Sequence, residues 1–458
     1  MILLYHLFLI VYKAGIHLVS SWNPKAKLWI EGRKNPVETF EKTSQTSGTF
    51  KTETFEKTSQ TSGTFKTETF EKTSETSETF FQTSLRKTIW MHSASLGEFE
   101  QGRPVLQKIK EIFPDANMVI TFFSPSGFEM VKNNKDFKNI FYLPMDSKSN
   151  AKKWMDMIKP DLVLWVKYEY WHFYLHEIKD RKIPLLMISG IYRSNQIFFK
   201  WYGGFYRKML DSFTHFFVQN EDSKMQLEKI IPEEKITVSG DTRCDRVINI
   251  AENFTDVAGI REFCGNSKVI VAGSTWEEDE TEWTHFVRKH PEIKFIIAPH
   301  EIDPENLHDV KKEFPRSVFY SEWVKEMAGK PATDEQQPNC LIIDNIGMLS
   351  GLYFYATITY VGGGFGSDGL HNILEAAVYG KPVIFGPEYD RNFEAEEMIS
   401  CSGAISISNA IELEKTVNDL LNNEEDLKRR SEAAKKYVYK NAGASEKIIS
   451  FIQKHQLL

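Results

Sequence analysis

Short apolar runs alternate with amphipathic stretches from Thr88 onward, and this alternation restricts the fold more than any other feature. The first series of runs reads "TIWMH", "NMVITFF", "DLVLWV", "IPLLMIS", "HFFVQ" and "KITVSG", and the second reads "KVIVAGS", "KFIIAPH", "CLIID", "ATITYVGGG" and "KPVIFGP". Such runs, separated by helices, are typical of parallel sheets with helices on both faces. The break near residues 240–253 predicts two doubly wound domains, with ligands beyond the carboxyl ends of their strands.

We expect the first domain over residues 85–245 and the second over residues 246–458. Before them, the word "TFEKTSQTSGTFKTE" fills residues 39–53 and recurs unchanged over residues 54–68. It consists mainly of Thr, Ser, Glu and Lys, and its apolar residues are too sparse to build a core. We therefore expect residues 36–84 to be a disordered or weakly ordered repeat insertion without a catalytic role.

The N-terminal segment "MILLYHLFLIVYKAGIHLV" is strongly apolar and is followed by the basic residues Lys25, Lys27, Arg33 and Lys34. Its unbroken apolar run is shorter than the ~20 residues that span a bilayer. We interpret residues 1–22 as an uncleaved membrane anchor that lies in the interface or barely spans, with the basic cluster on the cytoplasmic side. The alternative is a buried N-terminal helix of the first domain.

Charge and cysteine usage exclude several classes of protein. The net charge of −7 argues against a chain that coats nucleic acid. The four cysteines lie far apart, without the spacing of a metal site, which is typical of reduced thiols in the cytoplasm. No DxD motif occurs, which argues against a transferase that holds its nucleotide through a divalent metal. We therefore expect no metal and no cofactor.

The most informative stretch of the second domain is "TITYVGGGFGSDGLHNILEAAVYG". Glycines allow a close approach to the backbone, and a helix predicted from about His371 would offer free N–H groups to phosphate. The spacing matches neither the GxGxxG fingerprint nor a P-loop. Glu375, one turn into this helix, either accepts hydrogen bonds from a ribose or complements the helix dipole.

Two other strand ends of the second domain carry candidate binding residues. "IIAPHEID" places Pro299 and His300 at one of them, where His300 either contacts a nucleotide or is simply solvated. "DNIGMLSGLY" places Gly347, Met348 and Leu349 in a turn that opens a helix. The backbone amides of this turn suit a pyrimidine, although Met348 and Leu349 are by default core residues.

In the first domain, "SASLGEFE" contains Ser95-x-x-Glu98, the spacing of a capping box. A cap does not need the preceding Gly97, so the alternative is that Glu98 faces a substrate. Three more loops supply candidate residues on the acceptor side: Ser124 and Ser126, Glu169, and Arg193, which begins a basic, aromatic stretch suited either to an anionic lipid or to solvent.

Taken together, these motifs resemble one known family. "HSASLGE", "SPSG", "YEYW", "SGIYR", "SGDTRCDRV", "APHE", "VGGGF", "GLHNILEA" and "GPEYDRNFEA" occur in the order seen in 3-deoxy-D-manno-octulosonic acid (Kdo) transferases of lipopolysaccharide synthesis. The resemblance covers about 85–450 and the N-terminal anchor. It departs from the family at His300, where many members have arginine, and at Leu370, where many have glycine.

The resemblance implies the GT-B fold, with two Rossmann-like domains facing a cleft and an N-terminal membrane-anchoring helix. It implies inverting, metal-independent transfer of Kdo from CMP-Kdo to lipid IVA at the cytoplasmic side of the cell inner membrane, with Glu98 as the general base. By position, the CMP contacts would be Pro299, His300, Gly347, Met348, Leu349, Asn372, Ile373, Leu374 and Glu375. The partners would be CMP-Kdo, lipid IVA and inner membrane lipids, and no nucleic acid.

Two alternatives from other classes stay open. One is a sugar-nucleotide epimerase of the same fold, which would use a UDP-sugar and need no anchor. The other is an inactive, membrane-bound scaffold that binds a sugar nucleotide without turnover, although the presence of both Glu98 and Glu375 argues against it.

Overall fold

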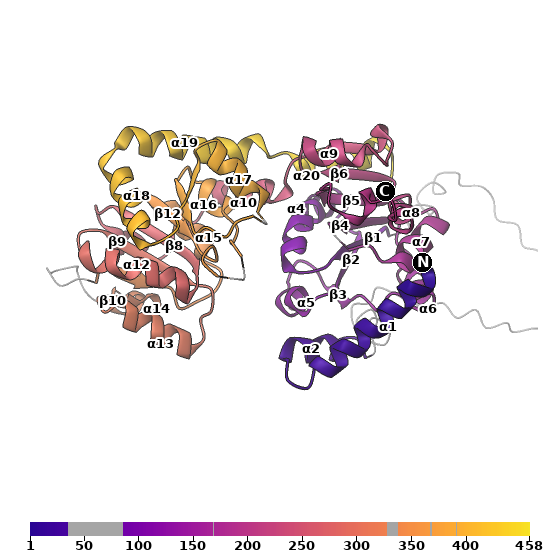
Figure 1. The fold of residues 1–458 in the computed structure, drawn as a ribbon, viewed down its shortest axis with the longest axis horizontal. Helices are drawn as coiled ribbons and strands as arrows, with labels where there is room; N and C mark the ends of the chain where they lie inside the picture. Colours follow the sequence, from indigo (N-terminus) through magenta and orange to yellow (C-terminus); the bar gives the residue numbers. More distant parts are fainter. Residues whose placement is uncertain (35–85, 168, 328–337, 367–368, 391) are drawn as a thin grey trace, which may run out of the picture. The chain divides into compact units, whose positions relative to one another are not determined.

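The computed structural model describes residues 1–34, 86–167, 169–327, 338–366, 369–390 and 392–458, so the predicted repeat insertion at 36–84 lies outside the described residues. These residues form two compact units (Figure 1). The first comprises Met1–Gly240 together with Ser445–Leu458, and the second comprises Asp241–Ala444.

The first unit is built on a seven-stranded parallel sheet with the strand order β3-β2-β1-β4-β5-β6-β7. Its strands are β1 (Thr88–Ser93), β2 (Asn117–Phe122), β3 (Asn139–Tyr142), β4 (Leu162–Val166), β5 (Leu185–Gly190), β6 (His215–Val218) and β7 (Ile236–Val238). Its helices are α1 (Ile2–Val19), α2 (Pro24–Glu31), α4 (Leu96–Ile112), α5 (Pro125–Val131), α6 (Lys148–Ile158), α7 (His172–Asp180), α8 (Gly204–Leu210), α9 (Glu221–Leu227) and α20 (Ala444–Lys454).

Strand residues of the first unit are buried on both faces of the sheet. Trp90, Val163 and Met187 belong to one apolar cluster, whereas their neighbours Ile89 and Leu164 belong to the cluster on the other face. Because successive side chains of a strand point to opposite faces, an unbroken apolar run requires helices on both sides. The predicted doubly wound arrangement is therefore confirmed for this unit.

The second unit repeats the design, with the strand order β10-β11-β9-β8-β12-β13-β14 and every pair parallel. Its strands are β8 (Val269–Thr275), β9 (Lys294–Pro299), β10 (Ser317–Phe319), β11 (Cys340–Ile342), β12 (Ile358–Val361), β13 (Val383–Phe385) and β14 (Ala404–Ser406). Its helices are α10 (Thr242–Glu252), α11 (Ile260–Cys264), α12 (Glu277–Lys289), α13 (Pro304–Glu313), α14 (Tyr320–Met327), α15 (Leu349–Leu352), α16 (Leu374–Ala377), α17 (Phe393–Ser400), α18 (Ala410–Asn422) and α19 (Glu424–Lys440).

The end of the chain does not stay in the second unit. The units divide between Gly240 and Asp241 and again between Ala444 and Ser445, where the sequence had suggested a single division between residues 245 and 246. The apolar face of α20, Ile448, Ile449 and Ile452, is buried in the first unit's core with β2 and β4 residues. Burial of this face explains why the chain returns.

The N-terminal helices pack on the first unit through a few side chains. Tyr5 and Leu9 of α1 and Trp29 of α2 are buried. The Tyr5 hydroxyl donates to Asp146 (2.6 Å), which also accepts from the backbone of α7. Burial raises the pKa of Asp146 to about 6 despite these donors. The start of α1 is thus joined to the loop that begins α6 and to α7.

Arg33, just after α2, is partly buried and its guanidinium is engaged within the first unit. Its guanidinium donates to the carbonyls of Leu143 (2.9 Å) and Phe123 (2.5 Å), and it stacks on the rings of Trp29 and Phe123. Burial lowers its pKa to about 10. Arg33 therefore fastens the N-terminal segment to the first unit.

The rest of α1 is exposed and apolar. Its exposed side chains are Ile2, Leu3, Leu4, Leu7, Phe8, Ile10, Val11 and Leu18. The helix has a mean hydropathy of 1.8 and is long enough to cross a membrane, yet only 11% of it is buried in the protein. The alternative of a buried core helix therefore does not describe α1, and the anchor stays a prediction.

Candidate active site

Every predicted site residue lies at or beyond the carboxyl end of a strand in its own unit. In the first unit Glu98 follows β1, Ser124 and Ser126 follow β2, Glu169 follows β4 and Arg193 follows β5. In the second unit Pro299 ends β9 and His300 follows it, Gly347–Leu349 follow β11, and Asn372–Glu375 follow β12. Because all strands of a parallel sheet end at one edge, each unit gathers its candidates along a single edge.

Glu98 forms a capping box at the start of α4. Its Oε2 accepts hydrogen bonds from the backbone N–H (3.0 Å) and the hydroxyl of the N-cap residue Ser95. Among the described residues both of these bonds use Oε2, so Oε1 is the oxygen that the cap does not hold. Gly97 is exposed, and a Cβ placed there would have only Ser95 Oγ within 4 Å. The capping box is therefore confirmed. Its bonds do not use Oε1 of Glu98, and the space beside Gly97 is open.

Glu169 is held by Trp171, which the sequence places at the same strand end, and by His92, which was not among the predicted site residues. Its Oε2 contacts Nε2 of His92 (2.9 Å) and accepts from the Trp171 indole (3.0 Å). His92, wholly buried in β1, uses Nδ1 to contact Thr121 (3.0 Å).

The tautomer of His92 follows from its partners. The Glu169 carboxylate can only accept, whereas Thr121, whose Oγ1 accepts from Trp90 (2.9 Å) and lies 3.5 Å from the Met91 carbonyl, can either donate to or accept from Nδ1. Nε2 then carries the proton and donates to the Glu169 carboxylate. One oxygen of Glu169 is thus fixed by a buried chain of hydrogen bonds. A histidine inside an apolar strand was the signal in the sequence.

The two serines after β2 have a local structural role. Ser124 is the N-cap of α5, where its Oγ accepts from Ser126 N–H (3.3 Å), and the two hydroxyls lie 3.0 Å apart. The Ser124 backbone donates to the carbonyl of Ala94 (2.7 Å), which ties this turn to the loop before Glu98. Arg193 is exposed in the loop after β5.

Glycine is required in the run after β12 because backbone atoms of neighbouring loops leave no room for a side chain there. A Cβ on Gly362 would lie 2.3 Å from the carbonyl oxygen of Ser274, and one on Gly364 would lie 2.7 Å from the backbone nitrogen of Gly386. Gly363 has φ +90°, which other residues rarely adopt. These glycines therefore let three loops pack together at the sheet edge.

Asp279, missed by sequence reasoning, fastens this loop. It is fully buried at the start of α12 and accepts from Trp276 N–H (3.0 Å), Gly363 N–H (2.8 Å) and the Tyr360 hydroxyl (2.6 Å). Burial raises its pKa in spite of these bonds. The acidic run "WEEDE" directly after a buried strand was the available signal, since a carboxylate at a helix start suggests a cap.

The helix that carries Glu375 is shorter than predicted. It begins at Leu374 rather than near His371 and has four residues. Glu375 Oε1 accepts from Asn372 (3.3 Å) and lies 3.4 Å from Nη1 of Arg246 on α10. A dipole effect worth ~0.3–1 kcal/mol in an ordinary helix is smaller in one of four residues. The pair with Arg246 therefore explains the position of Glu375 better than the dipole does.

His300 belongs to a stack of rings at the same edge. Its imidazole stacks on Trp276 and on His371, both at 4.5 Å between ring centroids. The Trp276 indole donates to Nε2 of His371 (3.2 Å). A base, a sugar ring or a phosphate could be bound by such a surface of rings and N–H groups.

The turn after β11 combines core packing with exposed backbone. Gly347 has φ +98°, and no atom lies within 4 Å of a Cβ placed on it. Met348 and Leu349 pack against the core of the second unit, as their default role predicts. The backbone at Gly347 is therefore open to a ligand, while the neighbouring side chains of Met348 and Leu349 are fixed by packing.

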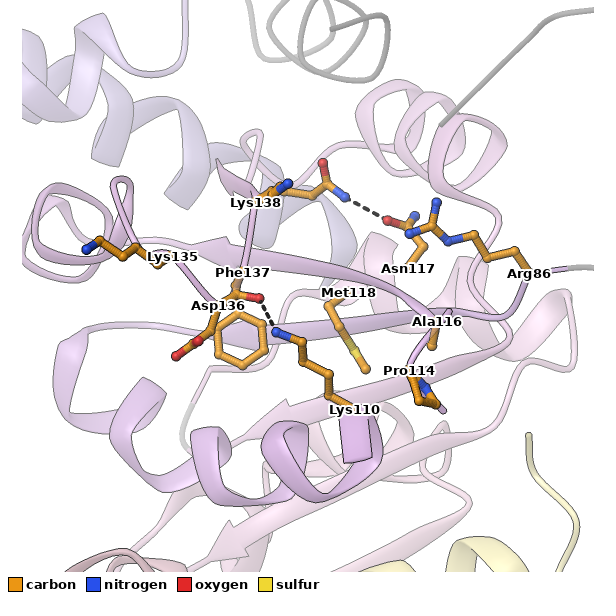
Figure 2. A pocket seen from close by; sticks show the side chains of 11 residues that line it. Arg86, Lys110, Pro114, Ala116, Asn117, Met118, Lys135, Asp136, Phe137 and Lys138 are labelled. Atoms are coloured by element: carbon orange, nitrogen blue, oxygen red, sulfur yellow. Dashed lines mark hydrogen bonds between the residues drawn. The ribbon is translucent and has the colours of Figure 1, made fainter. Parts of the chain in front are cut away.

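A separate basic hollow lies at the opposite edge of the first unit's sheet, where β2 and β3 begin. Figure 2 shows it, and Arg86, Lys110, Lys135 and Lys138 supply the cations that line its volume of about 260 Å³. No predicted site residue lines it. In the described part of the chain, no group of three or more His, Cys, Asp or Glu side chains is placed to hold a metal ion.

Comparison with known proteins points to one family. The model of the family described as 3-deoxy-D-manno-octulosonic-acid transferase (kdotransferase) matches residues 65–246. A 3-deoxy-D-manno-octulosonic acid transferase of Chlamydia trachomatis serovar A is 26% identical over 362 residues, 76% of this chain and 81% of that protein. A bifunctional glycosyltransferase/methyltransferase of Fusobacterium nucleatum is 26% identical over 347 residues, 73% of this chain, and the match spans about half (52%) of that protein.

The fold has solved counterparts. UDP-GlcNAc 2-epimerase from Neisseria meningitidis superposes with a TM-score of 0.58 at 17% identity, covering 80% of this chain and 100% of that one. At this identity the likeness concerns the fold alone. Together with the two doubly wound sheets and the apolar N-terminal helix, it confirms the predicted GT-B class.

Asp279→Ala should destabilise the second unit. Two buried donors, Tyr360 and Gly363, would lose their acceptor at a cost of ~1–3 kcal/mol each, so a total of at least ~2 kcal/mol is expected. The neighbouring exposed residue gives a matched control, Glu278→Ala, which should change the free energy of unfolding by no more than ~0.5 kcal/mol. Urea unfolding followed by proteolysis of the second unit measures both, and equal stabilities would disprove the role of Asp279.

Proposed function

Because this chain belongs to the Kdo transferase family of glycosyltransferases, we propose that it transfers Kdo from CMP-Kdo to the lipid A precursor lipid IVA in lipopolysaccharide synthesis. The observation that carries the proposal is Glu98. This carboxylate stands at the carboxyl edge of the first unit, inside the family match, with Oε2 in the cap and Oε1 outside it.

In the proposed reaction a hydroxyl of the acceptor attacks the anomeric carbon of Kdo from the face opposite CMP. The new C–O bond forms as the bond from that carbon to the phosphate oxygen breaks, and CMP leaves with the electron pair. Glu98 accepts the hydroxyl proton as general base. Inversion at the anomeric carbon follows from this geometry, and no metal takes part in any step.

We assign Glu169 to positioning rather than to proton transfer. One of its oxygens is already engaged by His92 and Trp171, which fixes the side chain at the same edge as Glu98. A fixed carboxylate suits hydroxyl groups of the acceptor sugar. Ser124, Ser126 and Arg193 would complete the acceptor side, with Arg193 as the cation for an acceptor phosphate.

The second unit would bind the nucleotide. In this proposal Glu375, oriented by Arg246, accepts hydrogen bonds from the ribose hydroxyls, and the amides of Gly347, Met348 and Leu349 meet the cytosine. Asn372, Ile373 and Leu374 would line the ribose and phosphate, and His300 with Pro299 would lie over the phosphate. The ring stack of Trp276, His300 and His371 supports this placement.

We further propose that the protein works at the cytoplasmic side of the cell inner membrane. The exposed apolar side of α1 supports this, because its large side chains are costly to leave in water. Contacts of Tyr5 and Arg33 keep α1 against the first unit, so the helix would lie in the interface beside the unit that receives the acceptor.

Incubation of the purified protein with CMP-Kdo and lipid IVA, followed by mass spectrometry of the lipid, tests the proposal. We expect the lipid to gain the mass of Kdo while CMP appears. An epimerase would instead convert a UDP-sugar without any acceptor. An inactive scaffold would bind CMP and leave both substrates unchanged.

Glu98→Gln separates the base from the cap. Glutamine also serves in a capping box, so the melting temperature and CMP affinity should hardly change. Turnover should fall by the ~10²–10⁴ that general-base catalysis supplies. Glu111→Gln, an exposed change on the same helix, is the control and should keep wild-type turnover. If the Glu98→Gln variant kept more than about a tenth of the turnover, far above that expectation, Glu98 would not be the base.

Glu375→Ala should weaken CMP binding. Loss of hydrogen bonds to a charged group costs roughly 1.5–3 kcal/mol, about a tenfold to hundredfold rise in Kd. Calorimetric titration with CMP measures it, and the exposed Glu425→Ala variant of the same unit is the control. Unchanged affinity for CMP would show that Glu375 does not bind the ribose, and its role would then be the structural ion pair with Arg246.

A further inference from the structure

Two hollows whose linings share residues lie on the first unit between the start of α1 and α8, and we call them together the groove. Its inner part, of about 370 Å³, is lined by Leu4 and Phe8 of α1, by Phe205 of α8 and by Glu169. Its outer part, of about 620 Å³, is lined by Leu3, His172, Gly204 and Lys208. Phe205 and Met1 line both parts, so the two parts are neighbours.

The floor of the groove is fixed by packed aromatic rings. Tyr5 contacts Phe205 (5.7 Å between ring centroids) and His172 (5.9 Å), and its hydroxyl is bonded to Asp146. Figure 1 shows α1 of this unit beside α7 and α8, the helices that supply these partners. The groove is therefore preformed, as ligand pockets usually are, and both volumes lie in the range of ~300–1,000 Å³ typical of such pockets.

The two ends of the groove differ in polarity. Glu169, whose carboxylate is held by His92 and Trp171, is among the residues that line the inner part. The outer end opens beside the exposed side chain of Lys208 and the exposed apolar residues of α1. Trp201, 91% exposed, precedes α8 in the chain. An apolar passage with a carboxylate at one end and a cation at the other fits an amphiphile with a sugar head.

We propose that one fatty acyl chain of the lipid acceptor occupies this groove, with its sugar at the Glu169 end. This inference rests on the proposed function and assigns an acyl-chain site to the acceptor side. Glu169 in the lining of the inner part favours the acceptor over a bulk phospholipid such as phosphatidylethanolamine, which has no sugar hydroxyls to meet a carboxylate. The groove thereby selects acceptors that carry an acyl chain close to the sugar.

Gly204→Leu tests the site by filling the outer part of the groove. A Cβ at Gly204 would have only the end of the Arg207 side chain within 4 Å, at 3.7 Å, so the variant should fold normally. The KM for lipid IVA should rise about tenfold or more, as expected when several methylene contacts are lost. The KM for a deacylated glucosamine disaccharide acceptor and the KM for CMP-Kdo should not change.

Gly15→Leu is the matched control. Gly15 lies on the exposed side of α1 outside the groove, with nothing within 4 Å of an added Cβ. This variant adds the same apolar side chain to the exposed side of α1 and should leave the KM values for both acceptors unchanged.

Equal KM values for lipid IVA in the wild type and the Gly204→Leu variant would overturn the acyl site. An equal rise for both acceptors would show a general defect instead of an acyl-chain site and would also overturn it. Failure of the proposed function looks different, because the wild-type protein would then transfer Kdo to neither acceptor.

Discussion

Burial of each sheet on both faces is the condition on which the rest of the structure depends. Residues of β1, β2, β4 and β5 are all buried, so most of their side chains are apolar. His92 is an instructive polar residue among them, because both of its ring nitrogens have partners within the unit. Polar chemistry is otherwise confined to the ends of the strands, and each unit consequently has one edge at which ligands can be bound.

The central strands were predictable because their runs are apolar and rich in β-branched residues. Three further strands, β3, β10 and β14, were not predicted, and each lies at the edge of its sheet. An edge strand is covered less completely by neighbouring elements, so fewer of its residues need to be apolar. The partly buried β10 also has only three residues, too few to show a clear hydrophobic pattern in the sequence. The predicted start of a helix near His371 was three residues early, because Gly369 (φ +89°) and Asn372 shape a turn there before α16 begins.

Candidate residues at strand ends could be read from the sequence, whereas the residues that orient them could not. Glu169 is paired with His92, 77 positions away, and Glu375 with Arg246, 129 positions away. Asp279 joins α12 to the glycine loop 84 positions later. Such pairs depend on which strands become neighbours in the sheet. The pattern of a single sequence does not reveal the order of the strands. The return of α20 to the first unit was hidden for the same reason.

The way α1 is attached has a practical consequence for making a soluble form of this protein. Truncation of the N-terminal segment would remove Tyr5 from Asp146 and leave the carbonyls of Phe123 and Leu143 without Arg33. It would also uncover aromatic rings next to Glu169. Solubility is better sought by exchanging the outward residues of α1, such as Leu3, Leu7 and Ile10, for polar ones while the inward contacts stay. In this molecule the exposed apolar helix α1 is also packed against the first unit through Tyr5 and Leu9.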